Sequence, residues 1–393
     1  MFEAAAKRTA IGRQPGRSGV WRVDFEAALT AVDELIHPPE TVAFLAPGFI
    51  DLQVNGFAGV DYNDPAASHE AIAESIRRQF TTGVTRFFPT VITASEERIT
   101  GALRNLTAAR TQFEKAGMPE AHAIAGFHVE GPHISAEDGP RGAHPIEHVR
   151  PPDIEEFKRW QEAAEGNIRL VTVSPEWEQT PAYVDAIVRM GVVASVGHTK
   201  ATREQIAAAV EAGASMSTHL GNAAHPVLHK TQNYIWEQLA QDRLTASFIV
   251  DGIHLPPAFV RAAVRAKGVE RAVLVTDAVM PAMCEPGTYR LGEVEVNLRP
   301  DGSVVLQGTQ RLAGSALRMD HAIANTIRMA AVSLGEALAM ATVNPARVGR
   351  LAGRQRGLSP GEKADLVRFR WDPDSYPLQI QETIVAGISV YKA

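Results

Sequence analysis

The stretch VVASVGHTKATREQIAAAVEAGASMSTHLGNA, residues 192–223, decides the fold. It begins with an apolar, β-rich run at 192–198, continues as an amphipathic helix at 202–212 that a glycine ends, and returns to a β-rich run at 215–219. A strand, a helix and a second strand in this order form a β-α-β unit, whose two strands lie parallel in one sheet. Both strand runs end on a histidine.

The same alternation continues along most of the chain. Eight short apolar runs are interpreted as strands, at 46–53, 84–90, 125–130, 168–174, 192–198, 215–219, 244–251 and 271–277. Amphipathic segments that indicate helices lie at 70–81, 152–164, 181–190, 202–212, 234–241 and 257–266. Eight strands with intervening helices predict an α/β fold of the (β/α)₈ TIM-barrel type, whose active site lies at the carboxyl ends of the strands.

The two ends of the chain do not follow this pattern. Near the carboxyl terminus, ADLVRFRW and TIVAGISVYK alternate apolar and polar residues as strands do. We expect a small β-sandwich domain built from residues 1–46 and 346–393, beside an amidohydrolase-type barrel at 47–345. A β-hairpin is expected as an insertion at about 288–308, and a helix at 315–331.

The composition excludes several classes of protein. The 393 residues carry a formal charge of −6, so the basic excess of a nucleic-acid-binding surface is missing. No run of about 18 apolar residues predicts a membrane span, and the amino-terminal stretch lacks the pattern of a secretory signal. A single cysteine fits a reducing compartment. Together these features predict a cytoplasmic protein without membrane or nucleic-acid partners.

Four predicted strands end on residues that can carry chemistry. Glu130, His198 and His219 form the nitrogen and oxygen ligand set that Zn²⁺ or Fe²⁺ accepts, with one coordination position left for water. Asp277 ends the eighth strand, where a carboxylate can take a proton from that water and pass it to a departing nitrogen. A single histidine at a strand end is more often structural, so the hypothesis depends on all four meeting at one barrel mouth.

Several motifs, in order and spacing, resemble one enzyme family. They are PGFIDLQVNG (47–56), HVEGPHIS (128–135), RGAH (141–144), SVGHT (195–199), THLGNA (218–223), DGIHL (251–255), LVTDAVMP (274–281) and LAGSAL (312–317). The chain resembles the N-acetylglucosamine-6-phosphate deacetylases of the amidohydrolase superfamily over residues 47 to about 345. The resemblance implies metal-dependent hydrolysis of the acetamide of N-acetyl-D-glucosamine 6-phosphate to D-glucosamine 6-phosphate and acetate, in amino-sugar catabolism.

The resemblance also assigns roles to individual residues. Glu130, His198 and His219 would bind the metal, Asp277 would be the catalytic acid/base, and His144 would polarise the acetyl carbonyl. The residues implied to contact the substrate are Ala143, His144, Asn222, Ala223, Lys230, His254, Leu312, Ala313 and Gly314. Lys230 stands at about the position where the family has a phosphate-binding arginine, which in some members crosses a dimer interface. A homodimer is therefore implied.

The expected number of metal ions depends on the end of the first strand. Members of the superfamily often have a His-x-His pair there, which binds a second metal. This chain has Gln53 and Asn55 instead, and amides cannot easily replace imidazoles as ligands. We predict one divalent ion, with Zn²⁺ expected first and Fe²⁺, Mn²⁺ or Co²⁺ as alternatives.

Three alternatives remain open on the sequence. The substrate could be the galactosamine epimer, an unphosphorylated N-acetyl amino sugar, or another amide, because lysine lacks the bidentate fork of arginine at the predicted phosphate contact. A non-catalytic sugar-phosphate sensor is disfavoured, since all four catalytic groups are present. His133, in the loop between Glu130 and His144, is interpreted as a surface histidine, with a pocket contact as its alternative.

Overall fold

The computed structural model describes residues 7–40, 43–292, 294–374 and 376–393. Its largest sheet has eight parallel strands in the order β14-β13-β12-β11-β10-β9-β8-β5. These are β5 (Phe49–Val54), β8 (Val84–Ile92), β9 (Phe127–Glu130), β10 (Ile168–Val173), β11 (Val193–Val196), β12 (Met216–Ser217), β13 (Thr245–Phe248) and β14 (Ala272–Leu274). An isolated parallel bridge between Val54 and Ala278 joins the first strand to the end of the last. The predicted (β/α)₈ barrel is confirmed.

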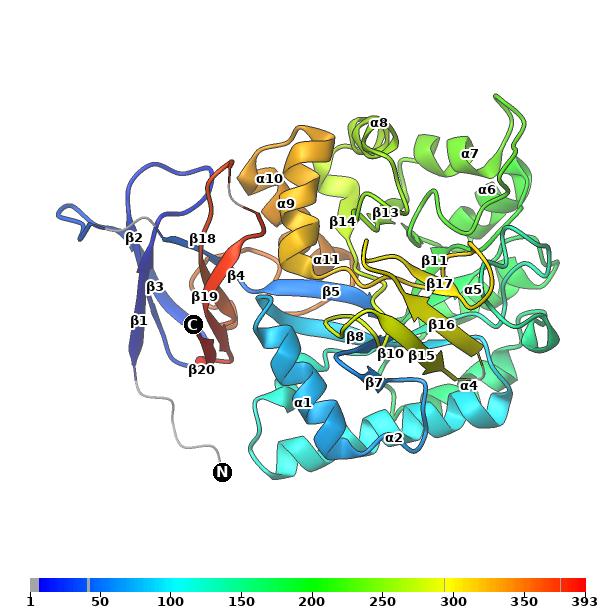
Figure 1. Cartoon of the computed structure of the whole chain (residues 1–393), viewed down its shortest axis with the longest axis horizontal. Helices are drawn as coiled ribbons and strands as arrows, with labels where there is room; N and C mark the ends of the chain where they lie inside the picture. Colours follow the sequence, from blue (N-terminus) through cyan, green and yellow to red (C-terminus); the bar gives the residue numbers. More distant parts are fainter. Residues whose placement is uncertain (1–6, 41–42, 293, 375) are drawn as a thin grey trace.

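Helices cover the outside of this barrel (Figure 1). They are α1 (His69–Phe80), α2 (Glu96–Lys115), α3 (Glu120–Ala123), α4 (Ile154–Ala163), α5 (Thr180–Arg189), α6 (Arg203–Glu211), α7 (Tyr234–Ala240), α8 (Pro257–Lys267), α9 (Met319–Ala330), α10 (Leu334–Ala341) and α11 (Val343–Val348). The six helices predicted between the strands are all present, and α2, which Ser95 caps, and the short α3 were not predicted. Among the described residues, we find no helix with the length and apolar character that crossing a bilayer requires.

The helix predicted at 315–331 starts later than expected, at Met319. The backbone N–H of Ser315 donates to the carbonyl of Asp277 at 3.0 Å, and its hydroxyl donates to the carbonyl of Thr276 at 2.5 Å. These bonds hold residue 315 against the end of the last barrel strand. Because the segment is engaged there, the first helical turn forms only after it.

Both chain ends build a second, antiparallel unit, with the blue and red strands adjacent in Figure 1. One sheet contains β1 (Arg8–Gly12), β2 (Trp21–Phe25) and β3 (Leu29–Glu34), and the other has the order β20-β19-β18-β4. The bounds of the latter strands are β4 (Phe44–Pro47), β18 (Leu366–Arg370), β19 (Gln379–Val385) and β20 (Ile388–Lys392). Val23 and Phe25 of the first sheet and Leu45 and Leu366 of the second share one buried cluster. The predicted β-sandwich is present, and the domain limits at 46/47 and 345/346 stay predictions.

The apolar run at 46–53 was predicted as one strand, which is wrong. Residues up to Pro47 pair with β18 of the small sheet, and the barrel strand β5 begins at Phe49. Gly48 separates the two strands, and a Cβ there would lie 2.2 Å from the side chain of Thr85. A continuous apolar run hides this change of sheet, since both strands are buried.

The insertion after the barrel has three strands, where a two-stranded hairpin was predicted. They are β15 (Gly287–Leu291), β16 (Val294–Leu298) and β17 (Val304–Leu306), and residue 293 of the predicted hairpin lies outside the described residues. Val296, Leu298 and Val304 pack with Val279 and Ala313 in a buried cluster of their own. The insertion is thereby fixed to the segments that follow β14, close to the barrel mouth.

A buried ion pair joins the small sheet to the barrel. Asp365, at the start of β18, accepts from Nε of Arg86 at 2.6 Å and from Nη1 of Arg354 at 2.5 Å. It also accepts from the backbone N–H of Ala386 at 2.7 Å. Burial alone would raise the pKa of Asp365, but the two guanidinium groups hold it well below its usual range. Arg86 lies near the start of β8, so the cluster sits at the amino end of the barrel.

Candidate active site

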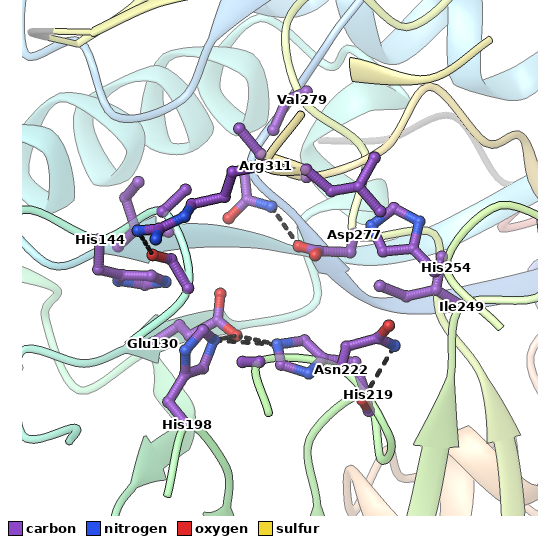
Figure 2. Close-up of a pocket in the computed structure, with 18 of the residues that line it drawn as sticks. Glu130, His144, His198, His219, Asn222, Ile249, His254, Asp277, Val279 and Arg311 are labelled. Atoms are coloured by element: carbon purple, nitrogen blue, oxygen red, sulfur yellow. Dashed lines mark hydrogen bonds and ion pairs between the residues drawn. The ribbon is translucent and has the colours of Figure 1, made fainter. Parts of the chain in front are cut away.

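Three buried side chains meet at the opposite, carboxyl end of the barrel. Glu130 is the last residue of β9, and His198 and His219 follow β11 and β12 by two residues each. Oε1 of Glu130 lies 2.9 Å from Nε2 of His219 and 3.2 Å from Nε2 of His198. The two Nε2 atoms are 3.1 Å apart (Figure 2). The sequence-predicted ligand set therefore forms one compact triangle.

The chemistry of this triangle fits a divalent ion. Nδ1 of His198 lies 3.0 Å from the carbonyl oxygen of Pro140, which can only accept, so Nδ1 carries a proton and Nε2, beside Glu130, is the nitrogen left to meet an ion. Burial would raise the pKa of Glu130, but hydrogen bonds with His198 and His219 hold it well below its usual value. A carboxylate and two imidazole nitrogens in contact form the donor set of sites that keep one position open.

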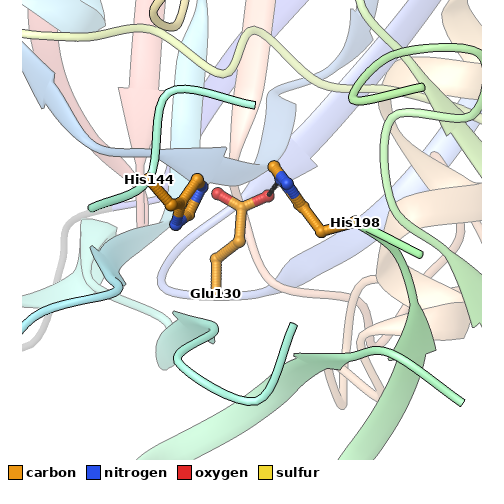
Figure 3. Close-up of side chains that lie close together, drawn as sticks. All are labelled: Glu130, His144 and His198. Atoms are coloured by element: carbon orange, nitrogen blue, oxygen red, sulfur yellow. Dashed lines mark ion pairs between the residues drawn. The ribbon is translucent and has the colours of Figure 1, made fainter. Parts of the chain in front are cut away.

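A different combination of ligands is also within reach. Glu130, His144 and His198 each offer an atom within 4.8 Å of the others (Figure 3). However, Nδ1 of His144 is already engaged with the hydroxyl of Thr93 at 2.7 Å. The separations of 2.9 to 3.2 Å among Glu130, His198 and His219 are much shorter. We therefore favour His219 over His144 as the third ligand.

Asp277 lies beside this triangle, and the amide of Gln53 joins its carboxylate to Glu130. Nε2 of Gln53 donates to Oε1 of Glu130 at 2.8 Å and to Oδ1 of Asp277 at 3.1 Å. Nδ2 of Asn55 donates to the same Oδ1 at 2.6 Å. Burial, followed by the charge of Glu130, raises the pKa of Asp277 to about 7. Asp277 can therefore exchange a proton near neutral pH.

The backbone at these residues is unusual. His198, His219, Ala223 and Asp277 have φ values of 48°, 30°, 47° and 51°, in the left-handed region that non-glycine residues rarely adopt. They are four of the ten described non-glycine residues with positive φ. Such strain persists where surrounding structure enforces it, and it gathers at functional sites. In this chain it turns the side chains that follow the strands into the barrel mouth.

A cavity of about 650 Å³ opens over these groups. Its lining includes Glu130, His198, His219 and Asp277, and Asn55 but not Gln53. The predicted substrate contacts that line it are Ala143, His144, Asn222, Ala223, His254, Leu312, Ala313 and Gly314. Its volume is in the range that small-molecule sites occupy.

Comparison with known proteins agrees with this geometry. A model of the amidohydrolase family matches residues 44–390. The chain belongs to the amidohydrolase family. An N-acetylglucosamine-6-phosphate deacetylase of Lysinibacillus sphaericus is 34% identical over 344 residues, which cover 88% of this chain and 84% of that protein. An N-acetylgalactosamine-6-phosphate deacetylase of Escherichia coli O157:H7 is 32% identical over 323 residues, 82% of each chain.

The similarity to one solved structure covers nearly the whole of this chain. That structure is an aspartate-to-alanine variant of N-acetyl-D-glucosamine-6-phosphate deacetylase from Mycobacterium smegmatis, in complex with N-acetyl-D-glucosamine-6-phosphate. The TM-score is 0.86 at 29% identity, and the match covers 97% of this chain and 99% of that one. Barrel, insertion and small sheet thus all lie within the similar part.

Two residues that the sequence singled out, Lys230 and His133, lie away from the cavity. Lys230 is exposed and does not line it, and its carbonyl accepts from the indole of Trp236 at 3.3 Å. His133 is fully buried, so the interpretation as a surface histidine is wrong. Its ring stacks on Trp160 with centroids 5.3 Å apart and meets the edge of Tyr183, outside the cavity lining. It therefore serves packing.

The rim of this cavity contains a contact that was not predicted from the sequence. Arg311 donates to Oδ1 of Asp138 at 2.6 Å and to the carbonyl of Gly142 at 3.2 Å, and all three line the opening. The contact joins the segment after the insertion to the loop after β9 (Figure 2). Arg311 directly precedes the LAGSAL motif, and this position was the one feature of the sequence that could have indicated a place at the cavity rim.

Proposed function

We propose that this amidohydrolase removes the acetyl group of N-acetyl-D-glucosamine 6-phosphate by metal-dependent hydrolysis, giving D-glucosamine 6-phosphate and acetate. The observation that carries the proposal is the position of Asp277, whose carboxylate shares the amide of Gln53 with Glu130 of the ligand triangle. The relatives named above support the substrate.

The residues that would hold the ion are Glu130, His198 and His219. A bound divalent ion supplies Lewis-acid chemistry, since it acidifies a water ligand and polarises a carbonyl. Asp277 accepts the proton of the attacking water and then gives it to the sugar nitrogen as the carbon–nitrogen bond breaks. With its pKa raised to about 7, Asp277 can perform both transfers. Gln53 and Asn55 keep it oriented.

His144 is placed to stabilise the oxyanion. Burial, followed by the nearby His198, lowers the pKa of His144 to about 3, so its ring is neutral. The hydroxyl of Thr93, 2.7 Å from Nδ1, can donate to that nitrogen, which leaves the proton on Nε2. An N–H at Nε2 can then donate to the acetyl oxygen, on which negative charge develops in the transition state.

His254 is our candidate for the phosphate end of the substrate. Its Nδ1 lies 2.6 Å from Oδ2 of Asp251, which orients the ring at the edge of the cavity (Figure 2). Burial would raise the pKa of Asp251, but the hydrogen bond from His254 lowers it below its usual value, so the carboxylate form of Asp251 is favoured. An imidazolium there would attract a phosphate.

Two further features stay predictions of the sequence. A single Zn²⁺ ion fits the donor set, and Fe²⁺, Mn²⁺ and Co²⁺ accept the same ligands. Metal analysis of protein purified without added metal distinguishes them, and a content of two ions per chain would contradict the assignment. A homodimer is also predicted, and measuring the molecular mass of the protein in solution tests it.

A second candidate is the galactosamine epimer, which the relative from Escherichia coli O157:H7 favours. The test of both is acetate release from N-acetylglucosamine 6-phosphate, N-acetylgalactosamine 6-phosphate and unphosphorylated N-acetylglucosamine. We expect the highest kcat/KM for the first. A higher value for the epimer would select the second candidate, and preference for the unphosphorylated sugar would overturn the phosphate assignment. His254→Ala should raise KM for phosphorylated substrates only.

A further inference from the structure

A second cavity, of about 430 Å³, lies at the other end of the barrel. Its lining includes Arg86 of β8 and Arg169 of β10, each near the amino end of its strand. Ala125 and Gly191, which precede β9 and β11, also belong to it. The cavity is therefore separated from the candidate active site by the length of the barrel strands.

The lining of this cavity is strongly cationic. It contains Arg86, Arg110, Arg169, Arg350, Arg354 and Lys363, with Glu114 as its only acidic side chain among the described residues. Asp365 behind the wall neutralises part of the charge of Arg86 and Arg354. The whole chain has a net charge of −6, so this concentration of positive charge opposes the overall balance. A concave cationic surface focuses the field and raises the local concentration of anions.

Several of these cations have unused hydrogen-bonding capacity. Within the described residues, the guanidinium of Arg169 and Nζ of Lys363 make no hydrogen bond or ion pair. Nε of Arg110 is buried without a hydrogen bond, although Glu114 lies 3.2 Å away as an ion pair. Burial, followed by the charge of Arg86, lowers the pKa of Lys363. Bringing these cations together costs free energy that a bound anion would offset.

The backbone also supports a built site. Arg350, which lines the cavity, has a φ of 54°, a conformation that residues with side chains rarely adopt. Its Nη1 reaches the carbonyl of Gly191 at 3.3 Å, across the cavity from its own segment. Observed strain of this kind is a reason to look for function.

We propose that this cavity binds a small anion that carries more than one phosphate group. Guanidinium groups match phosphate oxygens through paired N–H donors, and the four lining cations not paired with Asp365 can serve two such groups: Arg110, Arg169, Arg350 and Lys363. The volume is suitable for a small metabolite. Arg86 and Arg354 belong both to this cavity and to the Asp365 ion pair, so binding stabilises the junction of barrel and small sheet.

The test is calorimetric titration of the full-length, metal-loaded protein with fructose 1,6-bisphosphate as the probe. We expect saturable binding with Kd of about 1 mM or tighter at low salt, and weaker binding when salt approaches about 0.3 M. Removing two unpaired cations, in the double variant Arg169→Ala, Lys363→Ala, should weaken binding at least about tenfold, with deacetylase activity unchanged. A matched control, Lys158→Ala with Arg243→Ala, removes two exposed cations elsewhere and should bind normally.

Two further variants separate the outcomes. His254→Ala removes the proposed phosphate contact of the active site and should leave the affinity for the probe unchanged. Arg169→Glu provides a second test if the double variant unfolds at a lower temperature, and it should also lose binding. Equal affinity in the double variant, loss of binding in His254→Ala, or no saturable binding would each overturn the proposal. None of these outcomes bears on acetate release, so the proposed function is tested independently.

Discussion

Two buried aspartates at opposite ends of one barrel have opposite environments. Asp365, at the amino end, accepts from two guanidinium groups, and its pKa is held well below the usual range. Asp277, at the carboxyl end, accepts from two neutral amides and faces Glu130, and its pKa is raised to about 7. The first carboxylate therefore stays charged well below neutral pH, while the second can gain and lose a proton near neutral pH.

The two aspartates show that the partners of a buried carboxylate decide whether its pKa falls or rises. Desolvation acts on both side chains and is the largest influence on each. Arginine partners outweigh the desolvation and keep the carboxylate charged as a structural contact. Amide partners and a neighbouring carboxylate do not, so the carboxylate can be protonated near neutral pH. In a TIM barrel the carboxyl ends of the strands carry chemistry and the amino ends carry stability, and these two aspartates follow that division.

The largest expected effect is on catalysis at Asp277. Asp277→Asn retains the shape and the hydrogen-bonding reach of the side chain but cannot accept a proton, so kcat should fall by about 10³-fold. Metal content and substrate binding should be retained. The measurement is steady-state acetate release together with metal analysis. A variant with more than a tenth of the original kcat would show that another group transfers the proton.

Breaking the ion pair at the other end should affect folding and leave catalysis intact. Asp365→Asn leaves two buried guanidinium groups without their anion and should lower the free energy of unfolding by about 3 kcal/mol, with kcat of the folded protein unchanged. Because the folded pKa is depressed, this stabilisation is complete above about pH 4 and is lost as the pH falls below that value. Chemical denaturation at several pH values measures it. An equal loss of kcat would contradict the division.

Removal of the metal should reveal the opposite pH dependence at Asp277. Its folded pKa is raised, so in chelator-treated protein the folded state keeps a proton that the unfolded chain releases, and stability falls as the pH rises from about 4 to about 7. Asp277→Asn avoids this cost. The variant should exceed the parent by about 4 kcal/mol at pH 8 and match it near pH 4 in thermal or urea unfolding. Equal stability at both pH values would refute the raised pKa.

The smallest effect concerns the orientation of His144. Thr93→Val removes the hydroxyl that lies 2.7 Å from Nδ1, so kcat should fall about tenfold with KM nearly unchanged. Thr107→Val is a suitable control, because the Thr107 hydroxyl is buried without a hydrogen-bond partner and its removal should not reduce activity. If both variants had the same kcat, the hydroxyl of Thr93 would have no part in positioning His144.

The sequence predicted the barrel and the carboxyl ends of its strands well, because hydrophobic periodicity and polar strand ends are local signals. Three features of the structure were not predicted: the helix α2, the third strand of the insertion and the change of sheet at Gly48. The change of sheet at Gly48 could not be predicted, because a buried strand has the same apolar pattern whichever sheet it joins. The ligand set was predicted from the residue types at the strand ends and again from the family resemblance, and the structure adds the distances that support it.

Contacts between distant segments could not be predicted. Gln53 and Asn55 were expected only as replacements for metal ligands, yet both donate to Asp277. Arg311 meets Asp138 across 173 positions of sequence, which no local pattern encodes. His133 follows a strand end by only three residues, and nothing nearby in the chain indicates that Trp160 and Tyr183 will cover it.

Closure of the barrel between Val54 and Ala278 has a consequence for biosynthesis. Gln53 and Asp277 are separated by 224 positions, and their hydrogen bond forms only when the first strand meets the last. A nascent chain still lacking β14 already contains Glu130, His198 and His219, yet it has no proton-transfer group to place beside them. Contacts of such long range form slowly during folding. On the proposed mechanism, in which Asp277 transfers the proton, activity therefore requires the complete barrel.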